Sequence, residues 1–263
     1  MNLLFYILAI AVGIITGGIT SLIGASGVMI IVPILTILFK VNVHAAIGTS
    51  LFVDVIASLT VAYSYYKNGN IELKSGIWIA LSSIVGAQLG ALFASKMGEG
   101  NLSSSFGVVL IIAGILMIRK SYKEKSASSD TVSGFIHFKA EWQKILTALI
   151  IGLAIGILSG IFGAGGGVMI LLALIILMSF PLHKAIGTST LIMSITALSS
   201  TVGYAARGNI DFILGALIAA GAVLGGVLGS RYANKINEKT LQRVVGICFT
   251  GMGIVMTIIA IMK

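Results

Sequence analysis

One acidic side chain lies deep within an apolar stretch, and its type and position point directly to chemistry. Asp54 follows Leu51, Phe52 and Val53 near the middle of an uncharged segment. An ionisable group inside a membrane segment is costly and usually faces a transport pathway or a partner. Asp54 is therefore predicted to bind a coupling proton or cation, and a buried structural hydrogen bond is the alternative.

Two glycine-rich breaks precede short apolar segments, and both are predicted to bind an anion. Their members are Gly24, Ala25, Ser26 and Gly27 in the first break and Gly163, Gly165, Gly166 and Gly167 in the second. Glycine lets a ligand approach the main chain. A helix start offers unpaired N–H groups and the positive end of the helix dipole, which both favour an anion. Close helix packing is the alternative role, and it is expected for Gly13, Gly17, Gly86, Gly90, Gly152, Gly156, Gly160, Gly225 and Gly229.

Hydroxyl, amide and guanidinium groups at corresponding places after the two breaks complete the predicted substrate site. They are Thr49, Ser50 and Asn70 in the first half of the chain and Thr188, Ser189, Arg207 and Asn209 in the second. The hydroxyls can donate to an oxyanion or accept from a coupling cation, or they can bond back to their own helix. Each asparagine follows a glycine and also fits a turn. Arg207 can attract an anion or anchor its helix at the membrane surface.

Enzyme chemistry is not indicated. His44 and His183 have no partner cysteines or carboxylates nearby in sequence, so they are expected at the interface or at helix ends rather than around a metal. The sequence holds no P-loop, zinc-protease or nucleophile-elbow motif. We expect no catalytic residue, no metal and no cofactor. The net charge of +9 comes from basic residues in short loops, which indicates lipid contact rather than nucleic acid.

The composition requires a lipid bilayer to position these residues. Of the 263 residues, 57% are hydrophobic and 10% are charged, and Lys40 is the first charged residue. Apolar segments lie near residues 3–23, 28–39, 45–66, 75–95, 104–118, 145–162, 168–180, 184–206, 212–233 and 241–262. Most can cross a hydrocarbon core of roughly 30 Å as helices, but 28–39 and 168–180 are too short. The sequence predicts an all-α polytopic membrane protein with broken or re-entrant helices after the glycine-rich breaks.

The chain is an internal duplication. Residues 47–118 match residues 186–257 without gaps at 24 of 72 positions, far above what a biased composition gives by chance. The predicted organisation is a first membrane repeat (1–118), a serine-rich, charged cytoplasmic linker (119–144) and a second membrane repeat (145–263). Each repeat holds five apolar segments, an odd number, so the two repeats are predicted to be inverted relative to each other.

The distribution of basic residues predicts the orientation. With a cytoplasmic linker, thirteen basic residues lie on the cytoplasmic side and four on the other. Cytoplasmic loops carry an excess of Lys and Arg. Both termini are therefore predicted on the non-cytoplasmic side of the cytoplasmic (inner) membrane.

The repeated motifs resemble a known family. Gly-Ala-(Ser/Gly)-Gly-(Gly)-Val-Met-Ile, then His-(Ala/Lys)-Ala-Ile-Gly-Thr-Ser, then Gly-Asn-Ile occur in both halves and look like the TauE/SafE family of sulfite exporters and probable membrane transporters. The resemblance covers essentially the whole chain. The first copy of the motif departs from the fuller glycine pattern, because it has Ser26 where the second copy has Gly165 or Gly166. The two helix starts are therefore unequal. The resemblance also implies seven or eight membrane helices, fewer than the ten apolar segments. The two counts agree if two of the segments are half-length or re-entrant pieces.

The resemblance implies a bacterial or archaeal secondary transporter that moves a small sulfur-containing anion. Sulfite, thiosulfate and organosulfonates such as sulfoacetate are the implied substrates. The expected mechanism is alternating access, with coupling to a proton or cation. An anion channel and a carrier for a non-sulfur organic anion remain alternatives. The expected partners are the substrate anion and the bilayer, and the oligomeric state is open.

Overall fold

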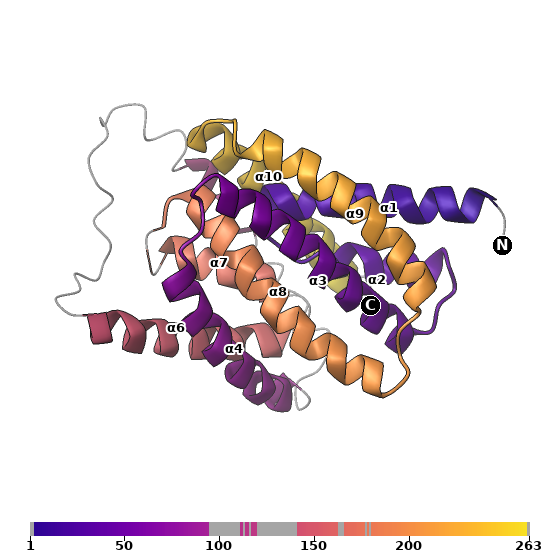
Figure 1. Cartoon of the computed structure of the whole chain (residues 1–263), viewed down its shortest axis with the longest axis horizontal. Helices are drawn as coiled ribbons and strands as arrows, with labels where there is room; N and C mark the ends of the chain where they lie inside the picture. The colour runs from indigo at the N-terminus through magenta and orange to yellow at the C-terminus, as the bar shows by residue number, and fades with distance from the viewer. Residues whose placement is uncertain are drawn as a thin grey trace.

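The computed structural model describes residues 3–94, 111–112, 114–115, 117–119, 141–162, 166–176, 178 and 180–261 (Figure 1). Every regular element within these ranges is an α-helix, which confirms the predicted all-helical class. The first half contributes α1 (Leu3–Ile23), α2 (Val28–Ile37), α3 (Val43–Lys67) and α4 (Leu73–Ala94). The second half contributes α6 (Glu141–Phe162), α7 (Gly166–Ile176), α8 (Leu182–Ala206), α9 (Phe212–Ala233) and α10 (Glu238–Ile261).

The described helices lie close to the predicted apolar segments, and the predicted division into two repeats and a linker stays a prediction. The helix α6 begins at Glu141, so the last four residues assigned to the linker belong to this helix. A search for apolar runs misses such a first turn, because charged residues are tolerated where a helix leaves the apolar layer. Linker residues 120–140 and most of the predicted segment 104–118 lie outside the described residues.

Four of the described helices are long and apolar enough to cross a membrane. The candidate spans are Phe5–Ile23, His44–Lys67, Leu182–Ala206 and Phe212–Ala233. In contrast, α2 and α7 have 10 and 11 residues. At a rise of about 1.5 Å per residue they are roughly 15 Å long, half of the apolar layer. The multi-pass membrane class is supported, and both short segments after the glycine-rich breaks are helices that reach only part of the way across.

The two halves are intertwined through their first helices. α1 packs along α9 of the second half, and α6 packs along α4 of the first half (Figure 1). Gly13 and Gly17 bring α1 so close to α9 that an added Cβ would overlap the α9 main chain. Gly152 and Gly156 meet α4 in the same way. Small residues at such interfaces let backbones approach closely, and the packing role predicted for these glycines is confirmed.

The equivalent helices α3 and α8 run antiparallel against each other. A Cβ added at Gly48, near the start of α3, would overlap the carbonyl oxygen of Asn209, just after the end of α8. A Cβ added at Gly187, near the start of α8, would overlap the carbonyl oxygen of Asn70, just after the end of α3. Such an exchange of the same contacts is the pattern of a two-fold relation. The inversion of the halves relative to a membrane stays a prediction.

One end of the bundle, which we call the basic end, gathers the described Lys67, Lys184, Arg231, Lys235 and Lys239. One hydrogen bond there joins the two halves, and two further contacts join helices within the second half. Asn70 Nδ2 donates to Asn234 Oδ1 at 2.7 Å, and the Leu182 amide donates to Glu238 Oε1. His183 Nε2 lies 3.0 Å from the Ala233 carbonyl oxygen. At the opposite end of α3 and α8 the described basic residues are Lys40 and Arg207.

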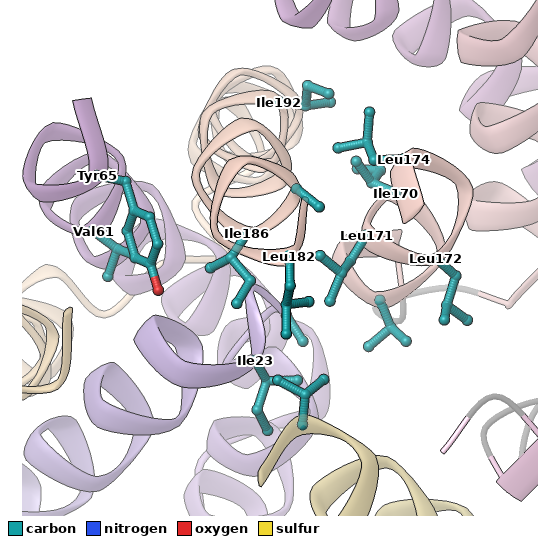
Figure 2. Packing of buried hydrophobic residues seen from close by; sticks show 14 of the residues in the cluster. Ile23, Val61, Tyr65, Ile170, Leu171, Leu172, Leu174, Leu182, Ile186 and Ile192 are labelled. Carbon is teal, nitrogen blue, oxygen red and sulfur yellow. The ribbon is translucent and has the colours of Figure 1, made fainter. Parts of the chain in front are cut away.

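A buried apolar cluster holds α7 against α8 and the end of α1 (Figure 2). Its members include Ile23 from α1, Val61 and Tyr65 from α3, Leu171 from α7 and Ile186 from α8. The hydroxyl of the fully buried Tyr65 donates to the Ser21 carbonyl oxygen at 3.0 Å. Lipid tails are as apolar as these side chains, so close packing and internal hydrogen bonds hold the helices together here. The cluster thereby positions the ends of both glycine-rich breaks.

Candidate functional site

The first break turns the chain from α1 into α2 at Gly24. Its φ of +65° lies in the left-handed region that favours glycine. The Gly24 carbonyl oxygen accepts a hydrogen bond from Ser189 Oγ of α8 at 3.2 Å. A Cβ added at Gly24 would lie 2.7 Å from that same Oγ. This position therefore requires glycine for its backbone angle and for its contact with the second half.

Asp54 caps the start of α2 with its carboxylate. Oδ2 accepts from Ser26 Oγ at 2.7 Å, and Oδ1 accepts from the Gly27 amide at 3.1 Å. Ser26 Oγ accepts in turn from the Val28 amide at 3.2 Å. Asp54 is 2% exposed and lies near the middle of the candidate span His44–Lys67. The Asp54 carboxylate, an oxyanion of the protein itself, thus accepts hydrogen bonds from Ser26 and Gly27, which the sequence predicts to bind an anion.

The start of α7 lies directly against the first break. A Cβ added at Gly167 would lie 2.8 Å from the Ser26 amide nitrogen and 2.6 Å from Met193 Sδ. Met193 occupies in the second repeat the position that Asp54 occupies in the first. The two helix starts meet, but one faces a carboxylate and the other a thioether.

Of the remaining residues of the two breaks, some lie at this junction and others lie outside the described residues. Ala25 belongs to the same junction, because a Cβ added at Gly167 would lie 3.2 Å from its Cα. Gly166 is the first residue of α7. Gly163 and Gly165 lie outside the described residues, so their predicted contribution stays a prediction.

The two threonines of the repeated Gly-Thr-Ser motif bind the main chain of the opposite half. The Asp211 amide donates to Thr49 Oγ1 at 2.9 Å, and the Glu72 amide donates to Thr188 Oγ1 at 3.1 Å. Asp211 and Glu72 are equivalent positions of the two repeats, and both threonines are fully buried. The contact therefore occurs once in each direction across the interface between α3 and α8, a structural role that the sequence alone did not indicate.

The two serines bond back to their own helices, one of the two roles left open by the sequence. Ser50 Oγ donates to the Ile47 carbonyl oxygen at 2.8 Å, and Ser189 Oγ donates to that of Ile186 at 2.9 Å. Ser189 also lies within hydrogen-bond distance of Gly24 in the first break. Of the two serines, Ser189 is therefore the one placed at the junction of the helix starts.

Asn70, Asn209 and Arg207 lie at turns rather than at the junction. The preceding glycines, Gly69 and Gly208, have φ values of +70° and +68°, which fits the turn role considered for Gly-Asn. Arg207 is exposed and forms the C-terminal cap of α8. Within the described residues, no hydrogen bond joins these three side chains to either break. Their participation in substrate binding stays a prediction.

A buried threonine beside the first break was not predicted. Thr20 is 1% exposed, and among the described residues its hydroxyl has no hydrogen-bond partner. It lies 3.6 Å from a Cβ placed on Gly27, the N-terminal cap of α2. Its position one helical turn before Gly24 was the available signal in the sequence. An unsatisfied buried hydroxyl is unusual in a native protein and needs an explanation.

Comparisons with known proteins place the chain in a family. A sequence model of the family described as sulfite exporter TauE/SafE matches residues 9–256, a range that includes both breaks and Asp54. No solved structure matches the chain.

Curated relatives span nearly its full length. The probable membrane transporter protein YdhB of Bacillus subtilis is 30% identical over 241 residues, which cover 90% of this chain and 94% of the relative. The probable membrane transporter protein MJ0441 of Methanocaldococcus jannaschii is 28% identical over 269 residues, which cover 97% and 96%. The chain therefore belongs to the sulfite exporter TauE/SafE family of membrane transporters.

Proposed function

We propose that this chain is a secondary transporter that carries a small sulfur-containing anion across the cytoplasmic membrane by alternating access. Sulfite, thiosulfate and organosulfonates such as sulfoacetate are the candidate substrates. The family description and the names of the relatives support transport. The observation that carries the proposal is the Asp54 carboxylate bound to Ser26 Oγ and the Gly27 amide at the start of α2.

The site is the junction of the α2 and α7 starts. Sulfite, sulfonates and carboxylates are all oxyanions, so donors that hold a carboxylate at 2.7 and 3.1 Å also suit the proposed substrates. The α7 start beside Gly167 adds a second helix end with a favourable dipole. The buried Thr20 hydroxyl, unpartnered among the described residues, offers one more donor next to Gly27.

Coupling follows from competition between Asp54 and the substrate. A substrate anion and the Asp54 carboxylate would require the same donors, and two negative charges repel strongly in a medium of low dielectric constant. Protonation removes the charge of Asp54 and releases the start of α2 for the substrate. A proton suits this carboxylate better than a metal ion, because Ser26 and Gly27 present hydrogen atoms to it rather than lone pairs.

The fold supports a membrane orientation for this mechanism. We place the basic end, with Lys67, Lys184 and Arg231, in the cytoplasm, in keeping with the excess of basic residues expected there. The antiparallel α3 and α8 then represent inverted repeats, and the N-terminus lies on the opposite side. Rocking of one half against the other would expose the junction alternately to the two sides.

Transport by proteoliposomes tests the proposal. Purified protein would be reconstituted, and uptake of labelled sulfite, thiosulfate and sulfoacetate measured with and without an imposed pH gradient. We expect the gradient to raise uptake of at least one of these anions. The Asp54→Asn variant keeps one acceptor oxygen and nearly the same shape but loses the proton site, so its uptake should fall at least about tenfold and no longer respond to the gradient.

The matched control is Ser58→Ala, one turn further along the same helix. Ser58 Oγ donates to the Asp54 carbonyl oxygen at 2.5 Å, so the change removes a buried hydroxyl near the site without altering the carboxylate. This variant should keep its response to the gradient. Gradient-driven uptake that persists in Asp54→Asn would refute the coupling. Conductance beyond carrier rates without counter-transport would indicate an anion channel instead.

A further inference from the structure

A second candidate binding site is a groove on the outer face of the bundle, away from the helix starts. It has a volume of about 250 Å³ and is lined by the last turns of α3, the start of α4 and Leu191 of α8. Its wall consists of apolar side chains and the rings of Tyr63 and Tyr66. Leu59 is 50% exposed and Tyr63 59%. Because α3 and α8 are candidate membrane spans, this open apolar face is directed toward lipid.

The groove ends beside a cation at the basic end. Lys67 Nζ lies 4.7 Å from the centroid of the Tyr63 ring, and within the described ranges it forms no ion pair. The only described acid in the adjoining turn is Glu72, whose amide donates to Thr188. Exposed tyrosines mark the depth of the lipid headgroups in membrane proteins. The groove therefore runs from the acyl-chain region to a positive charge at headgroup depth.

We propose that this groove binds an anionic phospholipid, with one acyl chain along Leu59, Ala62 and Leu191 and the phosphate near the Lys67 ammonium. Basic pockets between membrane helices on the cytoplasmic side are known to suit such headgroups. The volume is below the range of roughly 300–1,000 Å³ that is typical for compact ligands, and it accommodates part of a flexible chain. The groove joins α3 and α4 of the first half to α8 of the second, so the lipid contacts both halves.

Lipid retention by the purified protein tests this inference independently of transport. Native mass spectrometry would compare binding of phosphatidylglycerol and phosphatidylcholine with identical acyl chains. The wild type should bind phosphatidylglycerol more tightly. Lys67→Gln should weaken that binding about fivefold, the effect of one basic residue near an anionic surface, and leave phosphatidylcholine unchanged. Lys235→Gln, an exposed lysine at the same end but outside the groove, is the matched control and should bind like the wild type.

Filling the groove supplies a second variant. Leu59→Trp enlarges an exposed side chain on the groove wall and should reduce binding of both lipids, because the acyl chain loses its place. Equal binding of the two lipids to the wild type would overturn the proposal. Equal losses in Lys67→Gln and Lys235→Gln would also overturn it, as would a dimer that excludes lipid and separates on Leu59→Trp substitution.

Discussion

The two helix starts at the centre of the molecule face different side chains. At the start of α2, Asp54 accepts from Ser26 and Gly27 at 2.7 and 3.1 Å. At the start of α7, Met193 Sδ takes the equivalent place beside Gly167. A carboxylate can gain and lose a proton, whereas a thioether cannot. One start is therefore equipped for coupling, and the other offers its N–H groups without a competing negative charge among the described residues.

The surrounding scaffold shows no such difference. Thr49 and Thr188 each accept an amide of the opposite half, and Gly48 and Gly187 each meet the carbonyl of an asparagine. These contacts involve main-chain atoms, whose positions depend on the path of the helices rather than on side-chain chemistry. The two halves therefore form the same contacts where the main chain of one half packs against the other. They differ at the position of Asp54 and Met193, where only the first half carries an ionisable group.

The largest difference is expected when Asp54 and Met193 are changed to the same residue. Asp54→Leu removes the acceptor of the half-buried Ser26 hydroxyl and of the buried Gly27 amide, which should lower the free energy of unfolding by about 3 kcal/mol. Met193→Leu is close to volume-conserving and should cost less than about 1.5 kcal/mol. Equilibrium unfolding in mixed micelles measures both. Equal losses would contradict the asymmetry of the two helix starts.

A smaller and symmetric effect is expected at the crossing of α3 and α8. Gly48→Ala and Gly187→Ala should each destabilise the protein by about 2 kcal/mol, because the added methyl group meets a backbone carbonyl that cannot move freely. The control is Gly203→Ala in α8, where nothing lies within 4 Å of the added Cβ. This change should stabilise the helix by roughly 0.5–1 kcal/mol. Tolerance of the change in one half alone would disprove the two-fold relation.

The smallest effect is expected for the reciprocal threonines. Thr49→Val and Thr188→Val keep the shape of the side chain but leave the Asp211 or Glu72 amide without its acceptor, at a cost of about 1 kcal/mol each. Hydrogen exchange followed by mass spectrometry should show faster exchange at the corresponding amide. Ser50→Ala removes a hydroxyl that bonds to its own helix and should leave both amides unchanged. If Thr49→Val speeds exchange of the Asp211 amide but Thr188→Val does not speed exchange of the Glu72 amide, the two halves are not equivalent at this contact.

The sequence predicts the helices well, because lipid forces long apolar runs into helices whose length matches the apolar layer. It also marks Asp54, since a carboxylate in such a run is exceptional. It does not reveal that Ser26 and Gly27 are the partners of Asp54, or that Thr20 lies beside them. It also does not show that α6 begins at Glu141, because a helix can begin outside the apolar run.

What the sequence determined by itself is the membrane class, the duplication, the two short helices and the family. These properties follow from composition, from self-similarity and from the length of apolar runs, which are all local or repeated features. The tertiary structure alone decided which side chains meet at the breaks, because the contacts join distant positions. Ser189 and Gly24 are 165 residues apart, and Glu72 and Thr188 are 116 apart. Such pairings depend on how whole helices pack. The periodicity of residues within one helix does not predict which other helix it contacts.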